Sequence, residues 1–588
     1  MTTSSDRRQA VDVVVIGAGF AGLYALHRLK RSGLQVTCFE AGEGVGGAWY
    51  WNRYPGARVD FESMQYSYSF DDDLQQDWVW PELFSPQEDL ERYLNHVADR
   101  FGLRPMIQFG ARVDHIAFDE DVEKWRVSTE AGHQVTAKYV VAACGPTNVA
   151  NVPPFPGLDT FEGTSVHTAR WPEGGVEYAG KRVGVIGTGA SGVQVIPEVA
   201  KTADHLYVFQ RTPVYSVPAN NRPLQPDHER DWKDNYAERR AVARRNPYAM
   251  VLPVRQHGSV LAHTPEQRAE ILDAAWQQRS GLALMFLFDD VLTDAGANEV
   301  LAEWLRGKIR EVVADPETAE MLCPKTYPVG TKRLCVDNGY YETFNRENVT
   351  LVDVRDSPIV AITREGVQTE ARHHPVDVLI LATGFHGLTG SLTRMNVNGR
   401  GGVVLADKWK AGPVNYLGMV ISGFPNLFVV NGPRSPSVLT QMVAHSEYQV
   451  DWISALIEDM ERRGISSVDT TSDAETQRWE QLTAVAGQTL FPQADSWYTG
   501  ANIEGKPRNF MLWAGGFDTY IDMCDGVAAE GYTGLVLDEN SREKATDPEF
   551  SRRPSEAPGA ASGCASCAAG PRRPTAPTEV TGPGRTSR

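Results

Sequence analysis

Two stretches of the chain show the same succession of apolar and polar positions. In each, a short apolar run typical of a buried parallel strand is followed by a helical pattern and then by a second apolar run. The first stretch has its runs at residues 11–16 and 34–39, and the second has them at residues 183–186 and 205–209. Strand, helix and strand in this order predict a βαβ unit, so we expect two such units in an α/β fold.

A glycine-rich turn joins strand to helix in the first unit. Gly17, Gly19 and Gly22 have the spacing G-x-G-x-x-G, and Glu40 ends the second strand, 23 residues after Gly17. The glycines let the backbone approach a pyrophosphate, the helix N-terminus stabilises its charge, and Glu40 can accept from a ribose hydroxyl. Another glycine-rich turn follows at residues 44–47, as is typical of FAD enzymes. These features together predict a Rossmann-like domain that binds FAD.

The turn of the second unit repeats the spacing, with a different residue after the second strand. The turn residues expected to bind a dinucleotide are Gly187, Thr188, Gly189, Ser191 and Gly192. Arg211, followed by Thr212, stands 24 residues after Gly187, the place that Glu40 has in the first unit. A carboxylate there would repel a 2′-phosphate, whereas a guanidinium can bind it with two charge-assisted hydrogen bonds. We therefore expect NADPH at this second Rossmann-like domain, with Arg211 as a solvated surface cation being the alternative.

The remaining segments complete a two-domain arrangement. Between residues 227 and 316, Glu, Arg, Ala and Leu dominate at helical spacing and predict an inserted helical lobe. From about residue 540 the chain is rich in Pro, Ala, Gly, Ser and Thr without periodicity, which predicts disorder. The predicted segments are FAD-binding at 1–150 and 379–540, NADP-binding at 151–226 and 321–378, the helical insertion at 227–320 and a disordered tail at 541–588.

Composition narrows the range of partners. A net charge of −18 argues against nucleic acid and anionic membranes. The polar N-terminus and the absence of a long apolar run predict neither a signal peptide nor a membrane span. Seven scattered cysteines suggest no disulfide framework and hence a cytoplasmic protein, and Cys564 and Cys567 lack the further ligands of a metal site, so no metal is expected. The oligomeric state is left open between a monomer and a small homo-oligomer.

Two further segments carry the motifs of a known family. Residues 46–60 match G-G-x-W-Y-x-N-R-Y-P-G-x-x-x-D, and residues 161–172 match F-x-G-x-x-x-H-x-x-x-W-P. Over about residues 11–535 the chain resembles the Baeyer–Villiger monooxygenases, whose fingerprint lies between two nucleotide-binding turns as it does here. The resemblance implies that Gly47 and Trp49 pass the flavin. The fingerprint positions are Phe161, Gly163, His167, Trp171 and Pro172.

The resemblance implies an FAD-dependent enzyme that uses NADPH and O2 to convert a ketone to an ester or lactone through a C4a-peroxyflavin. It assigns Arg333 as the catalytic arginine and Asp60 as its carboxylate partner near the flavin. It places Lys332 near the 2′-phosphate of NADP and Trp497 in contact with NADP. An anion beside an electron-rich flavin needs a cation that keeps its proton, which arginine does and a desolvated lysine does not.

Some of these residues also have a purely structural interpretation. His167 titrates near neutrality and would suit a general base. The resemblance places it in the linker between the two domains, and the reaction needs a held anion more than a base, so a structural or motion-coupling role is favoured. Trp171 is expected to anchor the same linker. Surface charge for Lys332 and Arg333, and core packing for Trp497, are the alternatives.

Two other functions compete with this hypothesis. A flavin-dependent N- or S-oxygenating monooxygenase would share both turns but lacks an obvious counterpart of Arg333. A non-catalytic redox sensor that binds FAD and NADPH would need no Arg333–Asp60 pair. A disulfide reductase would need a cysteine pair after the first turn, and residues 44–51 contain none. Resemblance to phenylacetone, steroid and large-ring ketone enzymes favours a bulky or cyclic ketone as the substrate.

Overall fold

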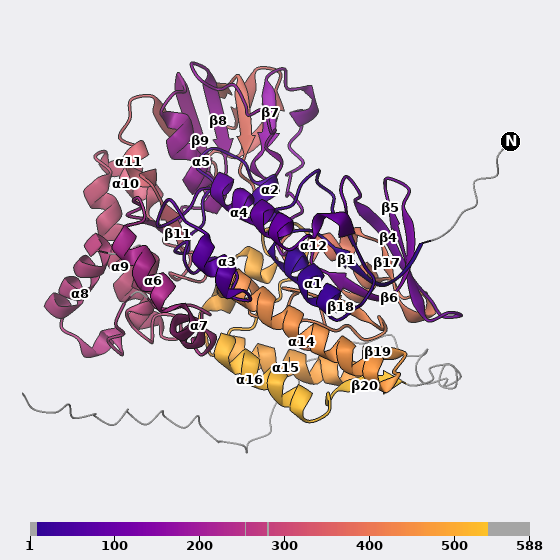
Figure 1. Ribbon diagram of the computed structural model, residues 1–588. Helices are drawn as coiled ribbons and strands as arrows, with labels where there is room; N and C mark the ends of the chain where they lie inside the picture. The colour runs from indigo at the N-terminus through magenta and orange to yellow at the C-terminus, as the bar shows by residue number, and fades with distance from the viewer. Residues whose placement is uncertain (1–8, 253, 279–280, 539–588) are drawn as a thin grey trace, which may run out of the picture. The chain divides into compact units, whose positions relative to one another are not determined.

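The structure is a computed structural model that describes residues 9–252, 254–278 and 281–538 of the 588 (Figure 1). Its larger sheet has eight strands in the order β17-β4-β5-β6-β1-β2-β3, and β18 also pairs with β6. The central strands β6, β1, β2 and β3 are parallel, whereas β4, β5 and β6 form an antiparallel meander. The strands are β1 (Gln9–Ile16), β2 (Val36–Phe39), β3 (Ile107–Gln108), β4 (Val113–Asp119), β5 (Lys124–Thr129), β6 (Gln134–Ala142), β17 (Val397–Asn398) and β18 (Leu427–Val429).

A second sheet has five strands, all parallel, in the order β12-β9-β8-β16-β7. They are β7 (Thr164–His167), β8 (Arg182–Ile186), β9 (His205–Gln210), β12 (Val349–Asp353) and β16 (Val378–Leu381). Strand β7 comes from the fingerprint, for which the sequence predicts no strand, and it forms an edge of this sheet. The whole of β16 pairs in this sheet. The predicted boundary between the NADP-binding segment ending at residue 378 and the FAD-binding segment starting at residue 379 therefore falls inside a strand. Each sheet contains the strand–turn–helix unit expected from the sequence, which confirms the predicted fold class.

Helices cover both sheets. Helix α1 starts at the first glycine turn and α5 starts at the second. Helix α14 packs against α1, where Asp451 Oδ1 accepts hydrogen bonds from Tyr24 Oη and Arg28 Nε, each at 2.8 Å. The helices outside the inserted lobe are α1 (Phe20–Arg31), α2 (Ala48–Trp51), α3 (Asp72–Asp77), α4 (Gln87–Arg100), α5 (Ala190–Ala200), α11 (Tyr340–Thr343), α12 (Gly390–Arg394), α13 (Leu405–Lys408), α14 (Met442–Arg463), α15 (Ser472–Gly487) and α16 (Phe517–Ala529).

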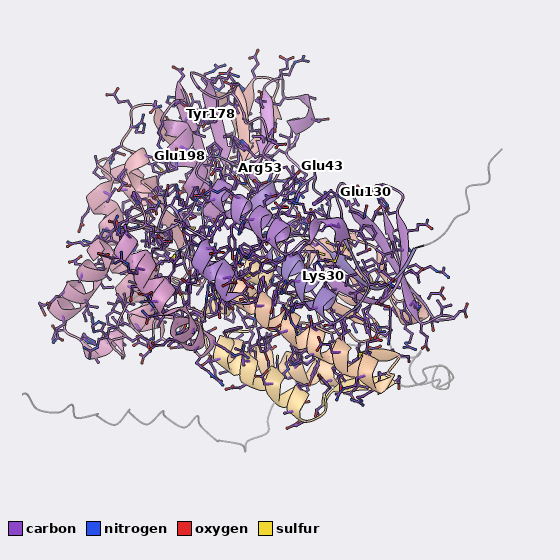
Figure 2. The ribbon with its side chains drawn as sticks, in the orientation of Figure 1. Lys30, Glu43, Arg53, Glu130, Tyr178 and Glu198 are labelled. Carbon is purple, nitrogen blue, oxygen red and sulfur yellow. The ribbon has the colours of Figure 1, made fainter. Side chains whose placement is uncertain are left out.

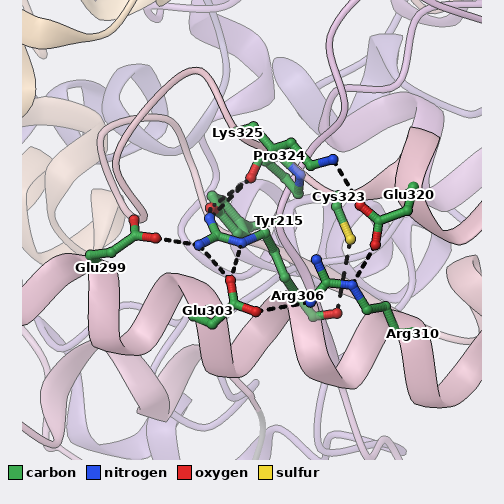
Figure 3. A network of polar contacts seen from close by, with 9 residues as sticks. All are labelled: Tyr215, Glu299, Glu303, Arg306, Arg310, Glu320, Cys323, Pro324 and Lys325. Carbon is green, nitrogen blue, oxygen red and sulfur yellow. Dashed lines mark hydrogen bonds and ion pairs between the residues drawn. The ribbon is translucent and has the colours of Figure 1, made fainter.

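The predicted helical lobe is present, and in the sequence it lies between strands β9 and β12 of the second sheet (Figure 1). Its helices are α6 (Pro226–Asp234), α7 (Tyr236–Arg244), α8 (Pro265–Gln278), α9 (Ala295–Val312) and α10 (Pro316–Leu322). Arg306 of α9 is 7% exposed, forms ion pairs with Glu299 and Glu303, and donates to Tyr215 Oη and the Pro324 carbonyl, each at 3.3 Å (Figure 3). A buried arginine needs several partners to offset its lost hydration. This network therefore fastens α9 to the segment that follows β9.

Three small sheets complete the described structure. β10 (Ser216–Pro218) pairs in parallel with β11 (Cys335–Asp337), and β19 (Ser467–Thr470) pairs antiparallel with β20 (Leu535–Asp538). β13 (Ile359–Thr363), β14 (Gly366–Thr369) and β15 (His373–Pro375) form an antiparallel sheet. No helix within the described ranges combines the length and the apolar character needed to cross a bilayer. The predicted disordered tail and the Cys564–Cys567 pair lie outside the described residues.

Two mid-helix glycines should respond in opposite ways to alanine. A Cβ on Gly22 of α1 would lie 1.8 Å from the Gly17 carbonyl oxygen, whereas a Cβ on Gly307 of α9 would meet nothing within 4 Å. We expect Gly22→Ala to destabilise the protein by about 1–3 kcal/mol through overpacking. Gly307→Ala should stabilise it by up to about 1 kcal/mol through helix propensity. Calorimetric melting midpoints at one scan rate and FAD concentration would measure both, and an unchanged midpoint for Gly22→Ala would contradict the close helix–strand approach.

Candidate active site

The glycine turn at residues 17–22 packs directly against the glycine-rich turn at residues 44–47. The amide of Gly46 donates to the Ala18 carbonyl at 3.0 Å, and a Cβ on Gly47 would lie 2.9 Å from the Gly19 Cα. Gly17 has a φ of +101°, which favours glycine. Helix α1 begins after Gly19 without a side-chain cap. Its first backbone N–H groups are therefore available to an anion, and the geometry fits the pyrophosphate of FAD.

Glu40 lies at the end of β2, as predicted, and supports the turn. It is 4% exposed, and its two carboxylate oxygens accept from the amides of Ala18 and Gly42, each at 2.7 Å. Burial raises the pKa of Glu40, although both amide bonds oppose that shift. Each carboxylate oxygen has a further lone pair, so Glu40 can hold the turn and still accept from a ribose hydroxyl.

The second turn offers the same kind of anion site. Gly187 has a φ of +108°, and a Cβ on Gly192 would lie 2.3 Å from the Gly187 carbonyl oxygen. Gly189 precedes α5 without a side-chain cap and faces open space, because a Cβ there would meet nothing within 4 Å. Thr188 Oγ1 donates to the Thr212 carbonyl at 2.9 Å, so the turn and the residues after β9 are joined. Ser191 is half-buried on the first turn of α5.

Two cations converge beside this turn. Lys332 Nζ lies 4.4 Å from the centroid of the Tyr327 ring. Burial and the nearby charge of Arg211 lower the pKa of Lys332 to about 8. Within the described part of the chain, neither Lys332 nor Arg211 forms an ion pair with a carboxylate. Two uncompensated cations suit a phosphate ligand, which the 2′-phosphate of NADPH would provide.

Arg333, the next residue along the chain, has different partners from Lys332 and pairs with Asp60. Its Nε and Nη2 lie 2.8 and 2.7 Å from Asp60 Oδ2, and its Nη1 donates to the Val438 carbonyl at 2.9 Å. The side chains of Arg333 and Asp60 are 26% and 28% exposed, so the pair is accessible. Burial alone would lower the pKa of Arg333, but Asp60, together with the nearby Tyr498 and Cys335, outweighs burial and raises the pKa above its ordinary value. The guanidinium therefore stays charged.

Aromatic side chains surround this ion pair. Arg333 lies 5.3 Å from the Phe61 ring, which stacks with Tyr66 at 6.4 Å, and Trp49 meets Tyr66 edge-on at 5.9 Å. Burial raises the pKa of Tyr498 to about 12, against the opposite effect of Arg333. The half-buried Trp497 meets Tyr498 at 4.8 Å. The structure thus brings Trp49 and the predicted catalytic pair to one aromatic wall, with Trp497 beside it.

The fingerprint residues occupy defined places at the edge of the second sheet. His167 is 7% exposed, its Nδ1 accepts from the Ala169 amide at 2.9 Å, and its Nε2 lies 3.2 Å from Thr383 Oγ1. Burial lowers the pKa of His167. A Cβ on Gly163 would lie 2.3 Å from the Asp377 carbonyl oxygen, so only glycine fits there. Trp171 is buried in the core, Phe161 is partly buried and Pro172 is exposed.

The fingerprint segment also contacts the flavin segment, partly through Arg170, Trp51 and Glu173, which are not specified positions of either motif. The Arg170 guanidinium lies 4.5 Å from the Trp51 ring, and Arg53, labelled in Figure 2, lies 4.3 Å from the Tyr50 ring. Arg53 also lies 3.6 Å from Glu173, which directly follows the fingerprint. Three consecutive aromatic residues, Trp49–Trp51, follow Gly47, but their pattern does not reveal these contacts because Arg170 and Glu173 are distant in the sequence.

A second contact joins the flavin segment to α5. Tyr54 Oη donates to Gln194 Oε1 at 2.8 Å, and Gln194 Nε2 donates to the Arg58 carbonyl at 2.9 Å. A Cβ on Gly56 would lie 2.5 Å from the Gln194 carbonyl oxygen. The loop that carries Asp60 is therefore seated on the helix of the second turn.

Comparisons with known proteins agree with this geometry. A family model described as flavin-binding monooxygenase-like matches residues 10–218. A Baeyer–Villiger monooxygenase of Pseudooceanicola batsensis is 41% identical over 90% of this chain and 97% of its own length. The chain belongs to the Baeyer–Villiger monooxygenase family. The solved structure of an oxidized steroid monooxygenase bound to NADP is 47% identical and superposes with a TM-score of 0.86 over 90% of this chain and 100% of that one.

Membership of the family confirms the expected enzyme class, a flavoprotein monooxygenase with FAD and NADPH as cofactors. The alternative of a non-catalytic redox sensor is set aside, because the relatives matched over nearly their whole length are enzymes. A phenazine N-monooxygenase of Lysobacter antibioticus is 39% identical over 90% of this chain and 97% of its own length. N-oxygenation therefore occurs among close relatives. The roles of individual residues stay predictions.

The lowered pKa of Lys332 gives a pH-dependent prediction. The Lys332 side chain carries its positive charge below about pH 8 and loses its proton above it. The second ionisation of a phosphate lies near pH 6, so the phosphate charge does not change around pH 8. Affinity for NADP⁺ should therefore fall as pH rises through about 8. Equilibrium titration of the FAD-loaded enzyme on both sides of that pH would measure the change. Lys332→Gln should bind more weakly and lose this dependence, and an identical pH profile in the variant would contradict the assignment.

Proposed function

We propose that the chain converts a bulky ketone to an ester or lactone with NADPH and O2, and that Arg333 and Asp60 form its catalytic pair. The accessible Arg333–Asp60 ion pair among aromatic side chains is the observation that carries this proposal. FAD, once bound and reduced by NADPH, would supply the activation of O2. The residues around it must then hold negative charge, exclude water and keep the ketone in place.

Arg333 has donors left for this task. A guanidinium has five N–H groups, and three of its nitrogens here contact Asp60 and Val438 with one N–H each. Tyr498 is a further hydrogen-bond partner of Arg333, which still leaves an N–H group to hold the charge that develops on the ketone oxygen. Asp60 orients the guanidinium and compensates for its partial burial. Because arginine does not lose its proton, this cation is present at every working pH.

His167 is proposed to position the fingerprint and not to act as a base. Both of its ring nitrogens have partners in the Ala169 amide and Thr383 Oγ1. Its pKa is lowered by burial, which favours the neutral ring. Thr383 follows β16, so His167 links the two adjacent strands at their carboxyl ends. This supports the structural role that the sequence favours.

The preference for a bulky or cyclic ketone is proposed from the similarity to a steroid monooxygenase at 47% identity. The second candidate is N- or S-oxygenation, favoured by the phenazine N-monooxygenase relative. Both reactions would use the same cofactors, so substrate competition separates them. We also propose a reducing cytoplasmic location, supported by five cysteines that are free within the described residues, Cys38, Cys144, Cys323, Cys335 and Cys524.

The domain limits are likewise proposed. The flavin domain would comprise residues 1–150 and 379–540, and the NADP domain residues 151–226 and 321–378, with the helical insertion at 227–320. Strand β16 pairs wholly in the five-stranded sheet, which supports moving the last NADP-domain limit from residue 378 to residue 381.

Replacing Arg333 should separate oxygen transfer from coenzyme oxidation. Arg333→Ala should lower ester or lactone formation by about 100- to 1000-fold, since one charge-stabilising donor group contributes that much at other active sites. Arg333→Lys should recover little, because a single ammonium lacks the planar guanidinium that contacts Asp60 through two nitrogens and Val438 through the third. Product mass and NADPH consumption would be measured at equal FAD content. Arg372→Ala, an exposed arginine, is the control. Unchanged product formation in Arg333→Ala would refute the assignment.

A panel of substrates should distinguish the two candidate reactions. Steroid, aryl and cyclic ketones, a thioether and a tertiary or aromatic amine would be offered singly with NADPH and O2. We expect the highest kcat/KM for a steroid or large cyclic ketone, with a product heavier by one oxygen atom. A phenazine-type amine turned over in preference to every ketone would favour N-oxygenation instead.

A further inference from the structure

Tyr327 contacts Lys332 and the segment that directly follows Arg211. Its side chain is almost fully buried, with the residue 8% exposed. Its hydroxyl donates to the Pro213 carbonyl at 3.1 Å and accepts from the Tyr215 amide at 3.3 Å. Pro213 follows Arg211 and Thr212 directly, so these bonds join the Tyr327 ring to the segment that carries Arg211.

The face of the Tyr327 ring holds Lys332. The Nζ atom lies 4.4 Å from the ring centroid, within the range of a cation–π interaction. The ring quadrupole stabilises the ammonium without adding a negative charge. A carboxylate in its place would hold Lys332 more tightly but would cancel its charge and repel a phosphate. An aromatic partner therefore suits a lysine that must stay attractive to an anion while half-buried.

A second tyrosine continues the support toward the helical lobe. The Tyr215 ring meets the Tyr327 ring edge-on at 5.6 Å. Its hydroxyl donates to the Pro324 carbonyl at 3.1 Å and accepts from Arg306 Nη1 at 3.3 Å (Figure 3). Arg306 is held by two carboxylates of α9, as described above. A continuous series of contacts thus runs from α9 through Tyr215 and Tyr327 to Lys332.

We propose that Tyr327 is a positioning residue that sets the preference for NADPH over NADH, by holding Lys332 beside Arg211, and that Tyr215 and Arg306 keep Tyr327 in place. The inference rests on the proposed contact of Lys332 with the 2′-phosphate. It goes beyond that contact by assigning coenzyme discrimination to a side chain that does not itself touch the phosphate.

The test is the ratio of affinities for NADP⁺ and NAD⁺, measured by equilibrium titration of the FAD-loaded, full-length protein. Tyr327→Leu should weaken NADP⁺ binding by about 5- to 30-fold, as expected for a partly desolvated cation–π contact, and leave NAD⁺ binding unchanged. Tyr327→Phe keeps the ring and loses both hydrogen bonds of the hydroxyl group. Its NADP⁺ affinity should therefore fall less, by about two- to fivefold. Tyr178→Leu, a half-buried tyrosine labelled in Figure 2, is the matched control and should leave the ratio as it is.

The pH profile gives a second readout that general destabilisation would not produce. Without the ring, the Lys332 ammonium loses a stabilising partner, so its proton should be lost at a lower pH. The fall in NADP⁺ affinity near pH 8 should then move to lower pH in Tyr327→Leu. Tyr327→Phe should keep the profile of the parent protein.

The Lys332→Gln variant separates failure of the inference from failure of the assignment beneath it. If Lys332→Gln leaves the NADP⁺/NAD⁺ ratio unchanged, Lys332 does not contact the phosphate and both proposals fall. If that variant lowers the ratio and neither Tyr327 variant does, the contact stands and the role of Tyr327 is refuted. In the double variant, Tyr327→Leu should add little to Lys332→Gln, whereas full additivity would overturn the inference. If Tyr327→Leu does not fold, Tyr327→Phe and Tyr215→Phe decide the question by the same ratio.

Discussion

The Arg333–Asp60 ion pair joins parts of the chain that are 273 residues apart. Asp60 comes from the loop that follows the flavin turns, and Arg333 comes from the segment that returns from the helical lobe. Asp60 reaches this place because its loop is seated on α5 through Tyr54 and Gln194. The charge pair exists only when the first sheet, the second turn and the returning segment are all in place. Much of the remaining architecture can be understood as the means of holding these two side chains together.

Neighbouring residues in that segment solve opposite electrostatic problems. Arg333 is compensated by a carboxylate, which keeps its guanidinium charged and oriented without using all of its N–H groups. Lys332 is next to another cation and has an aromatic ring in place of a carboxylate. The first arrangement suits charge that forms transiently during a reaction, because a net neutral pair does not bind anions tightly at rest. The second suits a permanent anion, because its positive charge is uncompensated until the ligand arrives.

Local patterns in the sequence predict the parts of the site that are built within short stretches. The glycine turns, Glu40 and Arg211 each follow a strand at fixed spacing, so their places were predictable from the hydrophobic pattern together with the glycine spacing. The pairing of Asp60 with Arg333 came from family resemblance and not from spacing. Strand β7 was missed because its four residues are mixed in character, with Thr164 and Ser165 exposed and Val166 and His167 buried. Tyr327, Gln194 and Arg170 act through partners far along the chain, which no single-sequence periodicity reveals.

The position of the fingerprint explains its residue types. Its strand β7 is an edge strand and pairs with β16 on one side. Gly163 is required because the Asp377 carbonyl, just before β16, occupies the space of a side chain. His167 then spans from the end of β7 to Thr383 after β16, which ties both strand ends together. Beyond that point Arg170 reaches the aromatic ring of Trp51 in the flavin segment. A segment bonded to the NADP sheet at its start and to the flavin loop at its end must follow any relative displacement of the two, so its motif can matter to catalysis without touching the substrate.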